Sequence, residues 1–361
     1  MVANAKASSK KGRHGSVNRR RLIQNAGSWL ALGCAEPVFG IGVPHRVMSH
    51  IERVDAALAG KAVDRPPYTL YRRRQPETQP FGAHNELSFH KDFNTDIVIV
   101  ANPYEYPTSG NSQWFDIKTL ESPFPDQLIT LESIRKGLKK KAYFVDAISS
   151  PFTTAWHLFN KRAYPHESSA SDSLKATQLQ AFREFQNSNE DAWKSALEAI
   201  TQSTVNHIAK AKEIGVSGCF VNVINATSRF GTAEEYERFS RPYDQRVFSE
   251  LADTKLTVVS LLDLDHSFIN RLQDFNASVV HYSSFKSGIS IAEIRKRFSG
   301  AIMGGVDETT YGSLHAGQIR KEWTLALEQA GPRFIVAPGG PISPELSGRQ
   351  LGHLQDSLSA W

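Results

Sequence analysis

The sequence predicts an α/β protein of the (β/α)8 TIM barrel class, and three observations support this fold. After the first 44 residues, eight short runs rich in β-branched and aromatic residues alternate with segments of helical periodicity. Several of these helical segments stop at a glycine before the next strand, as at Gly215 and Gly331. No strand is followed by a Gly-x-Gly-x-x-Gly turn or by a phosphate-binding Gly-Lys-Ser/Thr motif. A closed barrel is therefore favoured over an open nucleotide-binding sheet.

The eight strands are expected at hydrophobic runs that are bordered by glycine or polar residues. In chain order these runs are Tyr68–Tyr71, Asp96–Ala101, Ala142–Ile148, Gly218–Ile224, Leu256–Leu262, Ala277–Tyr282, Ala301–Gly304 and Phe334–Ala337. The last two enclose an amphipathic segment and so form a strand, helix, strand unit. In such units the chemistry gathers at the carboxyl ends of the strands.

The helices are expected where apolar residues recur three and four positions apart. These segments are Asp126–Lys141, Ser188–Gly215, Ala233–Asp253, Ile291–Phe298 and His315–Ala330. A long polar insertion, Lys161–Asn187, is predicted to be a surface excursion or a lid over the barrel mouth.

The charge of the chain is concentrated at its start. The formal net charge is +5, yet residues 1–44 hold seven Lys/Arg and one Glu, which leaves 35 basic and 36 acidic residues in the remainder. The basic character thus belongs to the leader, and nucleic-acid binding is not expected. The partner predicted instead is a small anionic molecule.

The leader resembles a bacterial export signal. Asn18–Gln24 reads Asn-Arg-Arg-Arg-Leu-Ile-Gln and precedes a modestly apolar run to Gly42, as in twin-arginine signals. We therefore expect residues 1–44 to be a leader handled by export machinery and residues 45–361 to be one barrel domain in the periplasm. The alternatives are a disordered basic segment of a cytoplasmic protein and, from Leu30–Cys34, a lipidated leader. No later segment has the roughly 18 consecutive apolar residues of a membrane span.

The two cysteines do not suggest a disulfide in the mature chain. Cys34 lies in the leader, and Cys219 lies in an apolar run where it is expected to be a small core residue. A zinc site made of cysteines alone is excluded for the same reason.

Four motifs together resemble the uroporphyrinogen decarboxylase superfamily. They are Ile51–Pro67, with its Glu-Arg and Asp-Arg-Pro-Pro pairs, then Ser150–Thr153, Met303–Glu308 and Val336–Gly340. The resemblance implies a (β/α)8 barrel with its site at the carboxyl ends of the strands. The family includes tetrapyrrole decarboxylases and zinc-dependent methyltransferases that act on corrinoid carriers.

Most of the decarboxylase machinery that the resemblance implies is replaced. Of the two arginines that hold substrate carboxylates after the first strand, Arg72 matches the first and Pro76 stands at the second, so Arg73 and Arg74 are candidate substitutes. The carboxylate expected after the second strand is absent, and Asn102 in its place could hydrogen-bond a pyrrole N–H. His157 falls near the family's Tyr, and Gly339 replaces its last His.

The zinc ligands of the methyltransferase branch are also replaced. Ser260-Leu261-Leu262 stands where a His-x-Cys pair is implied, and Gly340 stands where a Cys is implied. These side chains do not bind zinc, and we expect no metal and no cofactor. Asp263, Asp265 and His266 are candidates for a replacement site that would hold Mg or Mn, although Asp265 could instead cap the helix starting near Ser267.

Other polar and aromatic residues near strand ends complete the predicted site. Asp307, Glu308 and His281 are candidate acids or bases together with His157. Asn222 and Asn225 either face a ligand or satisfy loop backbone, since burying them unpaired is costly. Phe152, with Trp114 and Trp156, is a candidate apolar wall or part of the core.

Two functions follow from this pattern. The first is a lyase-type enzyme that acts on a tetrapyrrole or another carboxylate-bearing substrate. The second is a non-catalytic exported binding protein for a tetrapyrrole, a corrinoid or a small carboxylate, because binding needs less of the lost machinery than catalysis. An unrelated glycosidase with Asp146 and Asp307 as its carboxylates has no other support.

Overall fold

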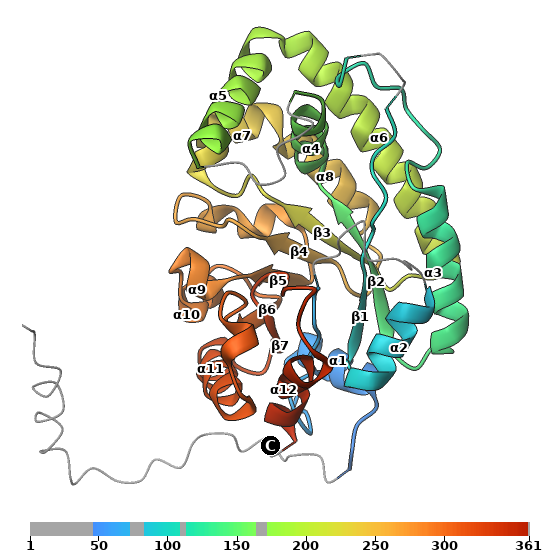
Figure 1. The fold of residues 1–361 in the computed structure, drawn as a ribbon, viewed down its shortest axis with the longest axis vertical. Coiled ribbons are helices and arrows are strands. Elements are labelled where there is room, and N and C mark those ends of the chain that lie inside the picture. The colour runs from blue at the N-terminus through green and yellow to red at the C-terminus, as the bar shows by residue number, and fades with distance from the viewer. Residues whose placement is uncertain (1–45, 73–82, 109–112, 164–171, 360–361) are drawn as a thin grey trace, which may run out of the picture. The chain divides into compact units, whose positions relative to one another are not determined.

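The computed structural model describes residues 46–72, 83–108, 113–163 and 172–359 (Figure 1). These residues belong to one compact unit, Val43–Trp361. The predicted leader lies outside the described residues, so the division at residue 44 and the export route stay predictions.

Seven parallel strands form one sheet in which each strand pairs with the next along the chain (Figure 1). They are β1 (Ile97–Val100), β2 (Tyr143–Ser149), β3 (Cys219–Val223), β4 (Val258–Leu261), β5 (Val279–Tyr282), β6 (Ala301–Val306) and β7 (Phe334–Pro338). Each strand overlaps one of the predicted runs, so those seven predictions are confirmed. The carboxyl ends of all seven strands therefore lie at one edge of the sheet.

The remaining predicted strand, Tyr68–Tyr71, which is the first along the chain, is not part of the regular sheet. It makes isolated parallel bridges on the β7 side, Tyr68 to Val336 and Arg72 to Ile342. On the other side, the Asp96 N–H donates to the Tyr68 carbonyl at 2.9 Å. Pro66 and Pro67 come just before this run and carry no N–H, which removes two donors from any longer ladder.

Helices connect the strands and flank the sheet (Figure 1). The α-helices are α1 (His50–Ala59), α2 (Ala83–Phe93), α3 (Pro125–Leu138), α4 (Pro151–Ala163), α5 (Asp172–Ser188), α6 (Glu190–Ile214), α7 (Ala233–Phe239), α8 (Arg241–Glu250), α9 (Ser284–Ser287), α10 (Ile291–Arg295), α11 (Ala316–Ala330) and α12 (Gly348–Leu358). Short 3-10 turns lie at Ser228–Phe230, Ile269–Phe275 and Tyr311–Ser313.

Two predictions about helices need correction. The single helix expected over Ala233–Asp253 is broken at Ser240, because Pro242 in the first turn of α8 has no N–H to continue α7. The insertion Lys161–Asn187 is largely helical in the part described, since α4 and α5 both enter it. Phe182 of α5 is fully buried against Trp193, so α5 is held by an aromatic core.

Side chains alternate between two faces of the sheet. One face forms a cluster that includes Ile97, Val145, Phe220 and Val258, and the helix-facing side forms others that include Val221 and Val280. Because the strands are buried on both faces, they read as continuous apolar runs in the sequence. No helix in the described part of the chain is long and apolar enough to cross a membrane.

Candidate functional site at the carboxyl ends of the strands

A row of polar side chains crosses four neighbouring strands. The register pairs Ser149 with Asn222, Asn222 with Ser260, and Ser260 with His281. Each lies two residues after an apolar member of the inner cluster, so all four face the inside of the curled sheet. The row thus forms a polar layer on top of the apolar interior.

His281 is the most constrained member of this row. It is fully buried, its Nε2 lies 2.9 Å from the Pro338 carbonyl, and its Nδ1 lies 2.9 Å from Ser260 Oγ. Since a carbonyl only accepts, Nε2 carries the hydrogen and Nδ1 accepts from the Ser260 hydroxyl. Burial lowers the pKa of His281 to about 4. A neutral ring with both nitrogens engaged has a structural role, and the predicted acid/base role finds no support in this geometry.

The two asparagines each have a buried oxygen that lacks a hydrogen-bond partner in the described chain. Asn222 Nδ2 donates to the Ile148 carbonyl at 3.3 Å, and Asn225 Nδ2 donates to Ser240 Oγ at 2.9 Å. In both residues Oδ1 has no partner. Asn222 lies on the inner face and is half-buried, whereas Asn225 is buried with Ser240 beside α7 and α8. Asn222 is therefore the better placed of the two to accept a hydrogen bond from a ligand.

Glu308 follows β6 and lies across the end of β7. Its Oε2 accepts a hydrogen bond from Ser283 Oγ at 2.9 Å. A Cβ on Gly339 would lie 2.5 Å from the Ser283 Cα and 3.0 Å from Glu308 Oε2, and one on Gly340 would lie 3.2 Å from Glu308 Cγ. Glycine at both positions thus leaves the space in which the Glu308 carboxylate lies.

This close approach gives a direct prediction for Gly339→Ala. The added methyl group clashes with the Ser283 backbone and crowds Glu308, so both must move away from it. We therefore expect the free energy of unfolding to fall by about 1–3 kcal/mol in urea denaturation. Gly352→Ala is the matched control, because a Cβ at Gly352 meets nothing within 4 Å and alanine favours the interior of α12. Equal stability of Gly339→Ala and the native protein would contradict the close packing.

Asp307 is engaged in a local turn rather than open to a ligand. Its Oδ1 accepts from the Thr309 N–H at 2.8 Å and from Thr309 Oγ1 at 2.6 Å, and Oδ2 accepts from Thr310 Oγ1 at 2.8 Å. Burial raises the pKa of Asp307, but these hydrogen bonds outweigh it and hold the pKa below its ordinary value. Asp307 is therefore an ionised turn residue, and a proton-donor role stays a prediction without geometric support.

The acidic residues after β4 form ion pairs and hydrogen bonds with the surrounding loops. Asp263 pairs with Arg229 at 2.6 Å and Lys286 at 2.5 Å. Asp265 accepts hydrogen bonds from Thr227, Ser228 and Ser267, which outweigh burial and lower its pKa to about 2. The Ser267 N–H donates to Asp265 at 2.9 Å in a local turn. The predicted helix cap is wrong, because the 3-10 turn begins at Ile269, with Phe268 as its N-cap and no side-chain cap.

His266 lies 3.6 Å from Glu293 and is exposed. Within the described ranges, no group of three or more His, Cys, Asp or Glu side chains is placed to hold a metal ion. Asp263, Asp265 and His266 thus each have a partner other than a metal.

The described residues among the remaining predicted ligand-binding positions are engaged in local contacts. Arg72 places its guanidinium 3.7 Å from the centre of the Phe89 ring of α2, and burial lowers its pKa. Arg73 and Arg74 lie outside the described residues. Asn102 accepts from the Tyr104 N–H at 3.0 Å in a tight turn. Carboxylate binding by the arginines and pyrrole binding by Asn102 stay predictions.

The α4 residues divide between surface and core. His157 is exposed, and Phe152 is buried with ring centres 5.5 Å from Phe182 and 5.7 Å from Trp193. Phe152 is therefore a core residue at the start of α4, as the alternative interpretation of the aromatic residues proposed.

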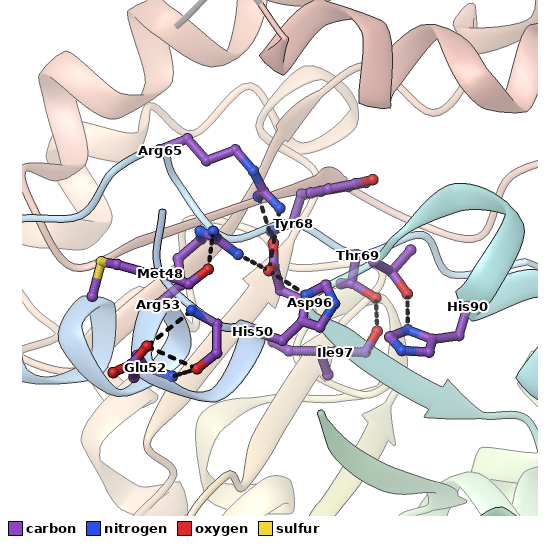
Figure 2. Close-up of polar contacts among 12 residues, drawn as sticks. Met48, His50, Glu52, Arg53, Arg65, Tyr68, Thr69, His90, Asp96 and Ile97 are labelled. Atoms are coloured by element: carbon purple, nitrogen blue, oxygen red, sulfur yellow. Dashed lines mark hydrogen bonds and ion pairs between the residues drawn. The ribbon is translucent and has the colours of Figure 1, made fainter. Parts of the chain in front are cut away.

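A buried ion-pair network that the sequence analysis did not recognise lies at the opposite end of the strands (Figure 2). Asp96, just before β1, has no exposed surface. Its carboxylate lies 2.5 Å from Arg53, 2.6 Å from Arg65 and 2.9 Å from His50 Nδ1, and it accepts from the Tyr68 N–H at 3.0 Å. We call these five residues the Asp96 hub.

The Asp96 hub explains the first motif, Ile51–Pro67. Arg53 also pairs with Asp64 at 2.7 Å, so the two arginines of that motif, Arg53 and Arg65, meet around the carboxylates of Asp64 and Asp96. Burial raises the pKa of Asp96, but His50, Arg65 and Arg53 outweigh it and keep the pKa below the ordinary value. The motif thus joins α1, the Tyr68–Tyr71 run and β1, which is a structural role. The charged residues of the motif and the Asp directly before β1 were the sequence signals for it.

The fold defines a parallel α/β protein, and comparison with known proteins shows the family to which it belongs. Residues 105–361 match the family Uroporphyrinogen decarboxylase (URO-D). The chain belongs to this family, as its four motifs indicated.

The chain is similar to solved structures. A methyltransferase from Methanosarcina mazei is 15% identical with a TM-score of 0.65, and the match covers 87% of this chain and 99% of that one. A B12-independent methionine synthase from Shewanella sp. W3-18-1 is 12% identical with a TM-score of 0.46, over 73% of this chain and 70% of the other. No curated protein matches the chain significantly.

Proposed function

We propose that this protein is a lyase-type enzyme that acts on a tetrapyrrole or another carboxylate-bearing substrate at the carboxyl ends of the strands, with Glu308 as the proton donor. The observation that carries the proposal is the position of Glu308. It is held by Ser283 and extends over Gly339 and Gly340, where the family's other members are implied to carry functional side chains. A titratable side chain thus lies beside the two positions at which the implied functional side chains are replaced by glycine.

The chemistry needs one proton at one carbon atom. In decarboxylation the bond from the substrate carbon to its carboxylate breaks, CO2 leaves, and the electron pair stays on the substrate. A carboxylic acid at Glu308 gives its proton to that carbon and is reprotonated from solvent, which its half-buried position allows. Asp307 and His281 are fully engaged by their neighbours, which leaves Glu308 as the best-placed acid of the three.

Substrate binding draws on the polar row. The Asn222 Oδ1 has no partner in the described chain and suits an N–H donor of a ligand. Arg72, Arg73 and Arg74 are the proposed source of positive charge for substrate carboxylates, since a guanidinium group pairs with a carboxylate through two hydrogen bonds.

We also propose that the Tyr68–Arg72 segment closes the sheet into a barrel. Its bridges to Val336 and Ile342 and its hydrogen bond with Asp96 support this, because they lie on both sides of the segment. Export through the twin-arginine leader to the periplasm is likewise a proposal that rests on Asn18–Gln24 alone.

The residues at the family's zinc positions do not fit a zinc ion. Ser260 donates its hydroxyl hydrogen to His281, Leu262 has no ligand atom, and Gly340 lies against Glu308. No step of the proposed reaction therefore passes through zinc.

A second candidate function is binding without turnover, for a tetrapyrrole, a corrinoid or a small carboxylate. The glycine at 339 and the turn at Asn102 favour it, because each replaces a group that the family's decarboxylases are implied to need. A site without those groups still offers shape and hydrogen bonds.

Anaerobic assays with uroporphyrinogen and coproporphyrinogen, in which turnover is measured as CO2 release, separate the two candidates. We expect turnover by the native protein and a loss of about 10²–10⁴-fold in Glu308→Gln, since this is the usual contribution of a general acid. Glu328→Gln, an exposed change on α11, should keep the native rate. Equal rates for Glu308→Gln and the native protein would contradict the assigned acid, and saturable binding without turnover would favour the binding protein.

A further inference from the structure

A concave site lies beside the Asp96 hub, at the end of the sheet where the strands begin. This cavity has a volume of ≈ 860 Å³ and is open to solvent. It is lined by the first turn of α1, by the turns that precede β1 and β2, and by the end of α12. Its volume is in the range of small-molecule sites. Because the strands are parallel, it lies at the opposite end from Glu308.

The lining of this cavity carries excess positive charge. Arg46, Arg53 and Arg65 each have a carboxylate partner, in Glu52, Asp64 or Asp96. Lys140 and Lys141 also line the cavity, and neither forms an ion pair with a described residue. The two ammonium groups are therefore the uncompensated charges at this site.

The backbone of the lining turns is held in an uncommon conformation. Asn94 has a φ of 47° and Lys140 a φ of 61°, both in the left-handed region. Lys139, the residue before, also has a positive φ of 50°. Two consecutive left-handed residues end α3 abruptly and place Lys140 and Lys141 at the cavity. Left-handed residues commonly end helices, so this geometry fixes where the two lysines lie.

The cavity also has an apolar part. Val47 is 86% exposed beside it, and Ile51 and Leu358 contribute further apolar lining. A ligand with an anionic group and a small apolar portion would cover Val47 and compensate the two lysines at once.

We propose that this cavity binds a small organic anion with at least two negative charges, carried by phosphate or carboxylate groups, at Lys140 and Lys141. Ammonium groups recognise such anions as point charges, and a concave low-dielectric wall strengthens the attraction. The site is independent of the proposed reaction, because no residue at the Glu308 end lines it.

Isothermal titration of the full-length protein with inorganic pyrophosphate and with citrate, at constant ionic strength, tests this proposal. The variant is Lys140→Asn with Lys141→Gln, in which asparagine suits the left-handed backbone at 140. The matched control is Lys136→Gln with Lys321→Gln, which removes the same charge from two exposed lysines outside the cavity.

We expect saturable binding of one or both anions that weakens at least 10-fold in the Lys140/Lys141 variant and stays native in the Lys136/Lys321 control. Binding of pyrophosphate alone assigns phosphate groups, and binding of citrate alone assigns carboxylates. The proposal is overturned if the native protein binds neither anion, or if the Lys140/Lys141 variant, folded by circular dichroism, binds as tightly as the native protein.

Discussion

Asp96→Asn should lower the free energy of unfolding by about 3–5 kcal/mol, the usual cost of removing one partner from a buried ion pair. The Asp96 carboxylate is fully buried and contacts two guanidinium groups, Arg53 and Arg65. An amide of the same size leaves both cations without that negative charge. Arg65 is affected most, because Arg53 keeps Asp64 as a partner.

Urea unfolding followed by circular dichroism measures this loss. Asp92→Asn is the matched control, since Asp92 is exposed on α2 four residues earlier and its change should stay within about 0.5 kcal/mol. A loss below about 1 kcal/mol in Asp96→Asn would show that the Asp96 hub does not hold the first motif to β1.

Asp244→Asn should remove a large pH dependence of stability. Asp244 is buried in α8, its Oδ1 has no partner in the described chain, and its Oδ2 accepts only from the Tyr236 hydroxyl at 3.3 Å. Burial raises the pKa of this carboxyl to about 7. Between about pH 4 and 7 the folded protein keeps a proton that the unfolded chain has released, so stability falls as the pH rises.

The size of this pH dependence follows from the shift in the pKa of Asp244. One pH unit corresponds to about 1.4 kcal/mol, so Asp244 accounts for a loss of roughly 4 kcal/mol over that interval. His281 acts in the opposite direction, because its pKa of about 4 makes the folded protein lose stability as the pH falls below about 6.5. His281 is present in both proteins, so its contribution cancels when the stability of Asp244→Asn is compared with that of the native protein.

Denaturant midpoints at pH 5, 6, 7 and 8 provide the test. The gap between Asp244→Asn and the native protein should grow in favour of the variant up to about pH 7 and then stay constant. Asp126→Asn, in the exposed first turn of α3, should keep the native pH dependence. A gap that does not change with pH would mean that Asp244 titrates normally.

Much of the fold could be predicted because the strands are buried on both faces. Runs such as Ile97–Val100 and Val279–Tyr282 are continuous apolar sequences and were found within one or two residues. The Tyr68–Tyr71 run is also rich in aromatic and β-branched residues, yet Pro66 and Pro67 limit its pairing. The break at Ser240 was also readable, since Pro242 cannot continue a helix.

The candidate site was harder to predict, since it depends on which side chains converge. The sequence placed Glu308, Asn222 and Gly339 near strand ends, but it did not show that Ser283 holds Glu308 over the glycines. It also did not show that Arg72 packs on Phe89 or that Asp307 closes its own turn. Alternation along a strand assigns a face, whereas hydrogen-bond partners come from other parts of the chain.

The central claim is that the carboxyl ends of the strands form a ligand site that includes Asn222 and Glu308. Titrating the full-length protein with uroporphyrin and coproporphyrin, by tryptophan fluorescence with inner-filter correction, tests it most directly. We predict saturable binding that Asn222→Leu weakens at least 10-fold, because the ligand loses its acceptor, and that Glu328→Gln leaves unchanged. No binding by a folded sample, or equal binding by Asn222→Leu and the native protein, would contradict the claim.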